Sequence, residues 1–276
     1  MMRTVSEYRH HALERLTQTY DSRESANIVS LWFQSRLGMS RTDLVLNATT
    51  EVSFATFEAD LDRLLKSEPI QHILGWAEFY GMTLKIDANT LIPRPETEEL
   101  VALVLDQIPL TPLRILDVGT GSGAIALAIK KHRPDCHVAA LDWSEAALNV
   151  ARQNAETQGL AVDFIHLDAL SMPLPEVDLV VSNPPYIPEL ERASMEQNVV
   201  QFEPDMALFV PQEDPLLFYR TIAMQAKSVA FEIHHDKGEE MRAMLVNFGY
   251  CEIDLHKDLQ GKDRIITAHH ESRRSY

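Results

Sequence analysis

The sequence has little cysteine and no long apolar run. Only two of its 276 residues are cysteine, Cys136 and Cys251, and neither belongs to a CxxC pair, so a zinc site or a disulfide framework is not expected. No stretch of about 18 apolar residues occurs, which argues against a membrane-spanning helix. The N-terminal stretch MMRTVSEYRHHALERL is too polar for the apolar core of a signal peptide. These absences favour a cytoplasmic protein that does not bind a membrane.

Basic residues are also scarce. Lysine and arginine number 25 against 41 aspartates and glutamates, which gives a formal charge of −16. A protein that grips a nucleic-acid backbone normally presents a basic face, so direct nucleic-acid binding is not expected. An acidic surface fits a protein partner better, above all a basic one. Three pairs of adjacent histidines, His234 and His235 among them, lack partners at metal-ligand spacing, so we expect no metal. A monomer is expected as well.

Glycine is nearly absent from the first 75 residues, where apolar residues recur three and four positions apart. This spacing predicts amphipathic helices, and we expect a small helical domain over residues 1–75. Residues 76–93 predict a β-hairpin linker in which Gly81 turns between two short β-like runs. An α/β domain is expected over residues 94–276, opening with a helix that Glu96 or Thr97 caps.

Strand-like and helix-like segments alternate from residue 113 onward. Seven apolar runs resemble strands, from LRILDVG and HVAALD to CEIDLHKD and RIITAHH. Strands that alternate with helices predict an α/β fold with a doubly wound, mostly parallel, Rossmann-like sheet. The last two strands are joined by only LQGKD. Because a parallel crossover needs a dozen or more residues, this final pair must be antiparallel.

A glycine-rich loop follows the first predicted strand of the sheet. LDVGTGSGA places Gly119, Thr120, Gly121, Ser122 and Gly123 between that strand and its helix. Glycine permits positive φ and a close approach of the backbone to a ligand. Ligands of open α/β sheets bind at the carboxyl ends of the strands. The loop alone suits either a nicotinamide dinucleotide or an adenosyl sulfonium.

Two aspartates end the next two predicted strands. Asp142, in AALDWS, can accept hydrogen bonds from both hydroxyls of a ribose. Asp168, in IHLDAL, would border an adenine pocket at the same edge, although aspartate is also common in such turns. The pair predicts a nucleoside site beside the glycine loop.

The stretch LVVSNPPYIP ends the fourth predicted strand of the sheet at the same edge. Pro184 holds Asn183 in an extended conformation, and neither Pro184 nor Pro185 donates a backbone N–H. The segment therefore offers two rigid acceptors, the Asn183 side-chain oxygen and the Pro184 carbonyl, with Tyr186 as a stacking face. Two acceptors can hold both hydrogens of a planar –NH2 group and leave its nitrogen open for attack.

These motifs together resemble a known family. ILDVGTGSGAIALAI and VVSNPPYIP resemble class I S-adenosylmethionine-dependent methyltransferases that modify planar exocyclic nitrogens. With QHILGWAEFYGMTLKID, LIPRPETEELV, FEPDMALF and KDLQGKDRII, the chain from about Gln71 to Ala268 resembles the release factor glutamine methyltransferase family, PrmC/HemK. The resemblance implies S-adenosylmethionine as cofactor and S-adenosylhomocysteine as product. It also implies methyl transfer to the side-chain amide nitrogen (N5) of the glutamine in the Gly-Gly-Gln motif of class 1 peptide chain release factors, which modulates translation termination.

The resemblance also implies roles for single residues. The loop Gly119 to Gly123 would hold the methionyl part of the cofactor, Asp142 its ribose, and Asp168 with Ala169 its adenine, although the family sometimes has an aromatic residue at the position of Ala169. The residues that would bind the substrate glutamine are Asn183, Pro184, Pro185 and Tyr186, and Asn183, Pro184 and Tyr186 would be catalytic, with Asn183 also next to the cofactor. The helical domain would dock the protein substrate.

Two bracing contacts are expected around this site. Glu203 and Pro204 in FEPDMALF are expected to brace the NPPY segment, and Asp263 is expected to form an ion pair with Arg264 and not a catalytic set.

Three other functions stay open at this point. A DNA adenine N6-methyltransferase also acts on a planar –NH2 group, but it must flip a base and grip phosphates, which the charge of −16 disfavours. A dinucleotide oxidoreductase would leave the NPPY stretch unexplained. An inactive binding module would not need the complete set of loop glycines, Asp142 and NPPY.

Overall fold

The computed structural model describes residues 2–270, and the chain divides into two units. The first unit runs to Gly75 and takes in Gln197–Phe202. The second begins at Trp76 and holds the rest of the chain. Within residues 2–270, no helix has the length and apolar character needed to cross a membrane.

The first unit is helical. Its helices are α1 (Val5–Leu16), α2 (Ser22–Leu37), α3 (Arg41–Leu46), α4 (Phe57–Leu64), α5 (Ile70–Leu74) and α9 (Gln197–Phe202), and its two-residue strands β1 (Arg3–Thr4) and β2 (Glu51–Val52) pair antiparallel. Asp21 caps α2, because its side chain accepts hydrogen bonds from two backbone N–H groups of the first turn. The core is aromatic: Trp32 stacks on Phe57 with ring centroids 4.9 Å apart, and both are almost fully buried.

A β-hairpin opens the second unit, as predicted. Strands β3 (Trp76–Phe79) and β4 (Met82–Lys85) pair antiparallel. The two residues of the turn, Tyr80 and Gly81, both have positive φ, 47° and 69°, which matches the right-handed twist of the strands. Glycine at the second position adopts this backbone without steric cost.

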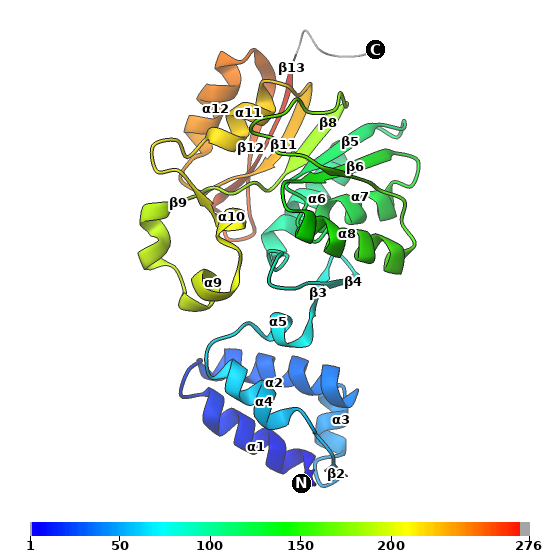
Figure 1. Cartoon of the computed structure of the whole chain (residues 1–276), viewed down its shortest axis with the longest axis vertical. Coiled ribbons are helices and arrows are strands. Elements are labelled where there is room, and N and C mark those ends of the chain that lie inside the picture. Colours follow the sequence, from blue (N-terminus) through cyan, green and yellow to red (C-terminus); the bar gives the residue numbers. More distant parts are fainter. Residues whose placement is uncertain (1, 271–276) are drawn as a thin grey trace. The chain divides into compact units, whose positions relative to one another are not determined.

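The second unit is built on a seven-stranded sheet, which confirms the predicted fold class (Figure 1). The strand order is β12 (Tyr250–Lys257), β13 (Asp263–His270), β11 (Ser228–Glu232), β8 (Leu179–Ser182), β5 (Arg114–Val118), β6 (His137–Asp142) and β7 (Asp163–His166). β13 runs antiparallel to both its neighbours, β12 and β11, and the other pairs are parallel. The last two strands, β12 and β13, are therefore antiparallel, as their short connection predicted.

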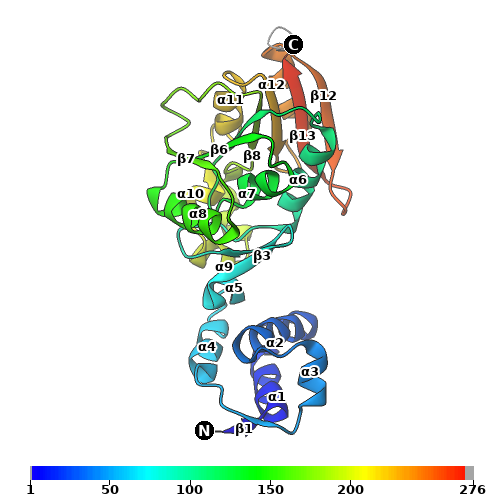
Figure 2. The same cartoon turned by 90° about the vertical axis from the view of Figure 1, so that its right-hand side faces the viewer.

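Helices cover both faces of this sheet (Figures 1 and 2). One apolar core joins the sheet to α6 (Pro95–Gln107), α7 (Ala124–His132) and α8 (Glu145–Gln158), and the other joins it to α11 (Leu217–Ala223) and α12 (Gly238–Asn247). Successive strand residues alternate between the two cores: Ile115 belongs to the first, and Leu116 to the second. Both faces of the strands are buried, which explains their unbroken apolar runs.

The chain between β8 and α11 is less regular and lies near the carboxyl end of β8. It contains β9 (Ile187–Pro188), a 3₁₀ turn over Glu189–Ser194, α10 (Asp205–Leu208) and β10 (Phe209–Val210), and β10 pairs parallel with β9.

One predicted cap is wrong. α6 begins at Pro95 with Arg94 as its N-cap residue, so neither Glu96 nor Thr97 caps it. Proline at the first helical position loses nothing, because the N–H it lacks has no partner within the helix there. The Thr97 side chain is therefore available for a contact outside its own helix.

Candidate active site

The two sequence motifs meet where the strand order reverses. From β5 the chain moves outward through β6 and β7, and then returns to place β8 on the other side of β5. Ligands of open α/β sheets bind in the crevice at such a switch point. The glycine loop follows β5 and the NPPY segment follows β8, so both border this crevice. Ser182 joins the two strand ends, because its hydroxyl donates to the Val118 carbonyl oxygen at 2.6 Å.

A cavity of about 460 Å³ lies at this edge of the sheet, within the usual size range of small-molecule sites. Loop and strand-end residues of the predicted site line it, namely Gly119, Gly121, Asp142, Asp168, Ala169, Asn183, Pro184 and Pro185. Sequence reasoning assigned no site role to several further lining residues, which include Asn89, Leu91, Trp143, Leu170, Met206 of α10, Phe209 of β10 and Phe218 of α11. Most of them are apolar, and most lie within stretches already quoted, such as AALDWS, IHLDAL and FEPDMALF, where an apolar side chain carries no chemical signal of its own.

The glycine loop leaves room where side chains would otherwise stand. Gly119 and Gly121 have φ of 74° and 56°, and an added Cβ at either would meet open space. Their backbone can therefore approach a ligand closely. Gly123 differs, since a Cβ there would lie 3.2 Å from the Ala151 side chain of α8. The structure thus places Gly123 at a helix contact, and it places Ser122 there too, because the Ser122 carbonyl accepts from Asn154 on α8.

Asp142 is held by the loop that it faces. Its carboxylate accepts from the Gly121 N–H at 2.9 Å and from the Ser144 N–H at 2.8 Å. Burial raises the pKa of Asp142, while these backbone hydrogen bonds oppose the shift. The carboxylate retains lone pairs for further donors, such as a pair of ribose hydroxyls.

The neighbouring strand end provides a second carboxylate and an apolar wall. Asp168 accepts from the Leu170 N–H and the Ser171 hydroxyl, so it also organises its own turn. Ala169 is buried and lines the cavity. An apolar surface beside a polar rim suits a planar base.

Residues of the NPPY segment face two sides: Asn183 lines the cavity, and Tyr186 points into the protein interior. Asn183 lines the cavity, and its Nδ2 donates to Thr97 Oγ1 of α6 at 3.1 Å. Tyr186 is turned the other way: its hydroxyl donates to Glu232 at 3.4 Å, and its ring meets His234 edge-on at 6.0 Å. Burial, joined by the charge of Glu232, raises the pKa of Tyr186, so the phenol stays protonated. Sequence reasoning missed Thr97 and Glu232, although Glu232 gave one signal, a polar residue that ends a buried strand.

His234 and His235 lie beside this interior side. Their ring centroids are 4.5 Å apart, and their ring nitrogens and the Asp236 carboxylate lie within 4.8 Å of one another. Burial lowers the pKa of His234, which keeps the ring neutral near pH 7 and suits packing against Tyr186.

Two predicted bracing contacts differ from the structure. The Glu203 carboxylate accepts from the Ile92 N–H at 3.4 Å and pairs with Arg94, so it holds the IPRP segment. Asp263 and Arg264 do not pair with each other; Asp263 binds Lys257 at 2.7 Å, and Arg264 binds Asp258 at 3.2 Å. Adjacent residues of a strand point to opposite faces of the sheet, which keeps their side chains apart.

Comparisons with known proteins agree with this fold. Residues 97–202 match the family model of the methyltransferase small domain, and residues 7–75 match that of the PrmC N-terminal domain. A crystal structure of a methyltransferase from Pyrococcus furiosus shares the fold, with a TM-score of 0.50 at 15% identity over 77% of this chain and 98% of its own. The class that these features define is the class I methyltransferases.

The sequence relatives narrow this class. The chain is 43% identical to a release factor glutamine methyltransferase of Bacteroides thetaiotaomicron, with 82% of this chain and 84% of the relative covered. It is 36% identical to one of Flavobacterium psychrophilum, with 95% and 98% covered. The chain belongs to the release factor glutamine methyltransferase family, which confirms the resemblance seen in its motifs.

Proposed function

We propose that this protein transfers a methyl group from S-adenosylmethionine to the side-chain amide nitrogen (N5) of the glutamine in the Gly-Gly-Gln motif of class 1 peptide chain release factors. Family membership supports this substrate. The observation that carries the chemistry is the position of Asn183 and Pro184, which both line the cavity beside the glycine loop. We also propose a cytoplasmic location, because release factors act during translation, and action as a monomer.

The residues present fit the proposed cofactor. The open space at Gly119 and Gly121 would receive its methionyl part, and the Asp142 carboxylate would accept its ribose hydroxyls. Asp168 and the apolar Ala169 would border its adenine. When bound, S-adenosylmethionine supplies an electrophilic methyl group on a sulfonium. We infer no role for a metal.

Asn183 and Pro184 would then hold the nucleophile. A primary amide nitrogen reacts poorly because its lone pair is delocalised into the carbonyl. The Asn183 side-chain oxygen and the Pro184 carbonyl would accept hydrogen bonds from its two N–H groups and fix the nitrogen in place. Such positioning supplies up to roughly 7–11 kcal/mol of a barrier. The same two oxygens would also stabilise positive charge that develops on the N–H groups. On methylation the nitrogen would lose one of these protons to water, with S-adenosylhomocysteine as the second product.

One assay tests the proposed function against its rivals. The protein is incubated with methyl-labelled S-adenosylmethionine and offered a class 1 release factor, the same factor with its Gly-Gly-Gln glutamine substituted, or DNA. We expect label only on the factor with the intact glutamine. Label on DNA would favour a DNA adenine N6-methyltransferase, and an absence of label everywhere would contradict a methyltransferase of either kind.

We further propose that the helical unit, residues 1–75, helps to dock the release factor, while residues 76–93 link it to the methyltransferase domain over residues 94–276. The match to the PrmC N-terminal domain over residues 7–75 supports this division. Removal of residues 1–70 should raise the KM for release factor far more than the Kd for S-adenosylmethionine. Equal changes in both constants would contradict a docking role.

A further inference from the structure

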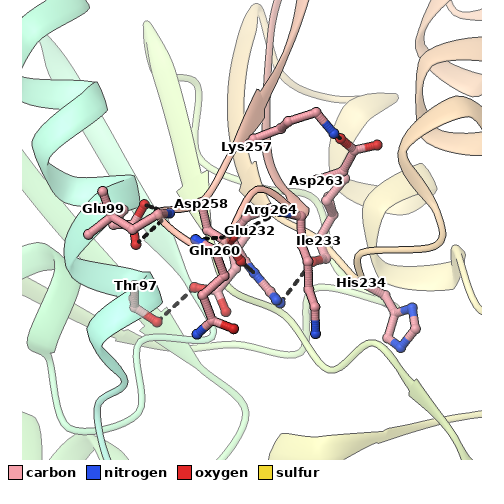
Figure 3. A network of polar contacts seen from close by, with 12 residues as sticks. Thr97, Glu99, Glu232, Ile233, His234, Lys257, Asp258, Gln260, Asp263 and Arg264 are labelled. Atoms are coloured by element: carbon pink, nitrogen blue, oxygen red, sulfur yellow. Dashed lines mark hydrogen bonds and ion pairs between the residues drawn. The ribbon is translucent and has the colours of Figure 1, made fainter.

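Asn183 is tied to two residues from distant parts of the chain. Its Nδ2 donates to Thr97 Oγ1 at 3.1 Å, and Thr97 Oγ1 donates in turn to Glu232 Oε2 at 2.7 Å. Thr97 is 5% exposed and Glu232 is 1% exposed. Figure 3 shows Thr97 on α6 directed toward Glu232 at the end of β11. The three residues form a buried chain of hydrogen bonds that ends at the cavity.

The hydrogen bonds of this chain of three residues all donate in one direction, from Asn183 to Thr97 and from Thr97 to Glu232. An ionised carboxylate can only accept, so Glu232 takes the single hydroxyl hydrogen of Thr97. The Thr97 oxygen must then accept from Asn183, which places the amide –NH2 of Asn183 toward Thr97. The opposite amide orientation would set an oxygen against an oxygen in a buried site and leave both without a donor. The Asn183 Oδ1 remains available, because residues 2–270 offer it no hydrogen bond.

We propose that Thr97 and Glu232 are positioning residues that fix the Asn183 amide with its oxygen available to the methyl-accepting nitrogen. This inference rests on the proposed function, in which Asn183 must accept a hydrogen from the substrate amide. A reversed Asn183 would instead present –NH2 to –NH2 and repel the substrate. Pro184 needs no such control, since its carbonyl direction is set by the backbone.

The groups around Glu232 determine the pH at which its carboxyl group ionises and can orient the Asn183 amide through Thr97. Tyr186 donates to Oε1 at 3.4 Å, and Tyr219 of α11 donates to the Glu232 main-chain oxygen at 2.8 Å. Arg264 of β13 stabilises the ionised carboxylate, whereas the charge of Glu96 on α6 opposes it. Burial outweighs the stabilising contacts and raises the pKa of Glu232 to about 7.

Protonation of Glu232 would allow the hydrogen bonds among Asn183, Thr97 and Glu232 to run in either direction. A neutral carboxyl group can donate its own hydrogen to Thr97, whose hydroxyl can then turn and donate to Asn183. Both amide orientations become possible, and the productive one loses its advantage. Turnover should therefore rise with pH as Glu232 ionises, with a midpoint near 7.

A matched pair of variants at Thr97 tests the role. Thr97→Val keeps the shape and removes the hydroxyl, so kcat for methylation of release factor should fall at least about tenfold, a loss of roughly 1.4 kcal/mol in transition-state stabilisation. Thr97→Ser keeps the hydroxyl and should retain kcat within about twofold. The Kd for S-adenosylmethionine should be unchanged in both, which also shows that they fold. Wild-type kcat in Thr97→Val would overturn the inference.

Glu232→Gln separates positioning from simple packing. Glutamine keeps the volume and one acceptor oxygen for Thr97, replaces the other oxygen by an –NH2 donor, and does not ionise. The wild type and Thr97→Ser should show the rise of kcat near pH 7, and Glu232→Gln should lose it. The same rise in Glu232→Gln would assign it to another group and overturn the inference.

A substrate-free measurement keeps the two proposals distinguishable. The side-chain amide resonances of Asn183, assigned by their absence from Asn183→Ala, should shift with a midpoint near pH 7 in the wild type and not in Thr97→Val. A wild type that shows this shift but does not methylate release factor would refute the proposed function and leave the positioning role intact. Resonances that do not respond to pH in the wild type would refute the positioning role.

Discussion

The glycine loop rests on a buried carboxyl group whose ionisation should control the stability of the methyltransferase unit. Asp117 on β5 is fully buried. Its Oδ2 accepts from the Thr120 hydroxyl at 2.6 Å and from the Ala126 N–H at 3.2 Å, while Oδ1 has no hydrogen-bond partner among residues 2–270. Burial raises the pKa of Asp117 from 3.8 to about 7, even though both hydrogen bonds act to lower it.

The raised pKa of Asp117 determines how the stability of the fold changes with pH. The folded state holds the proton more tightly than the unfolded state does, so the stability that Asp117 contributes is fully present below about pH 4. It is lost as the pH rises toward the folded pKa of about 7. A tenfold difference in proton affinity between the two states corresponds to about 1.4 kcal/mol, so roughly 3 kcal/mol should disappear between about pH 4.5 and about pH 7.5.

Asp117→Asn should remove this dependence. Asparagine can present its oxygen to Thr120 and Ala126, and it carries no charge to bury. Urea unfolding at a series of pH values should show the variant close to the wild type near pH 4.5 and more stable by roughly 3 kcal/mol near pH 7.5. Glu232 also has a raised pKa and remains in both proteins, so its contribution cancels in the difference. Unfolding curves that keep a constant separation across this range would refute the assignment.

Three further substitutions test separate parts of the structure. Asn183→Ala should lower turnover at least about 100-fold with the cofactor Kd changed only a few-fold, and a near-normal single-turnover rate would exclude its role. Asp142→Asn should raise the Kd for S-adenosylmethionine about tenfold, measured by calorimetry, because one charged acceptor is lost; an unchanged Kd would exclude ribose binding. Asp60→Ala should destabilise the helical unit by roughly 3 kcal/mol in thermal unfolding, since Asp60 accepts from Trp32 at 3.0 Å and from Arg36 at 2.9 Å. A change below about 1 kcal/mol would show that the Asp60 contacts contribute little.

The sheet could be predicted because its strands are buried on both faces. Leu179–Ser182 is buried at every position, and such an unbroken run between turn residues is a strand signal that does not depend on neighbours. The antiparallel final pair followed from the length of its connection, and the hairpin at Gly81 from glycine between two β-like runs. Each of these features is encoded within a few residues of chain.

The errors came from contacts that short segments do not encode. Glu96 or Thr97 was predicted to cap α6, and threonine before an apolar run is a common helix start. Proline at the first helical position and an outside partner for Thr97 decided otherwise. Asp263 and Arg264 were paired from adjacency along the chain, although strand geometry directs them apart.

In the site, too, some features are encoded in a short segment and others depend on contacts between distant residues. The acceptors of the NPPY segment follow from the chemistry of asparagine and proline, but an asparagine amide has two orientations, and only one presents an oxygen to the substrate. The sequence of the segment does not choose between them. The choice depends on Thr97, 86 residues away from Asn183, and on Glu232, 135 residues away from Thr97. A motif can therefore specify which atoms are available for catalysis, while the fold decides which way they face, because hydrogen-bond direction passes along a chain of partners to a single buried carboxylate.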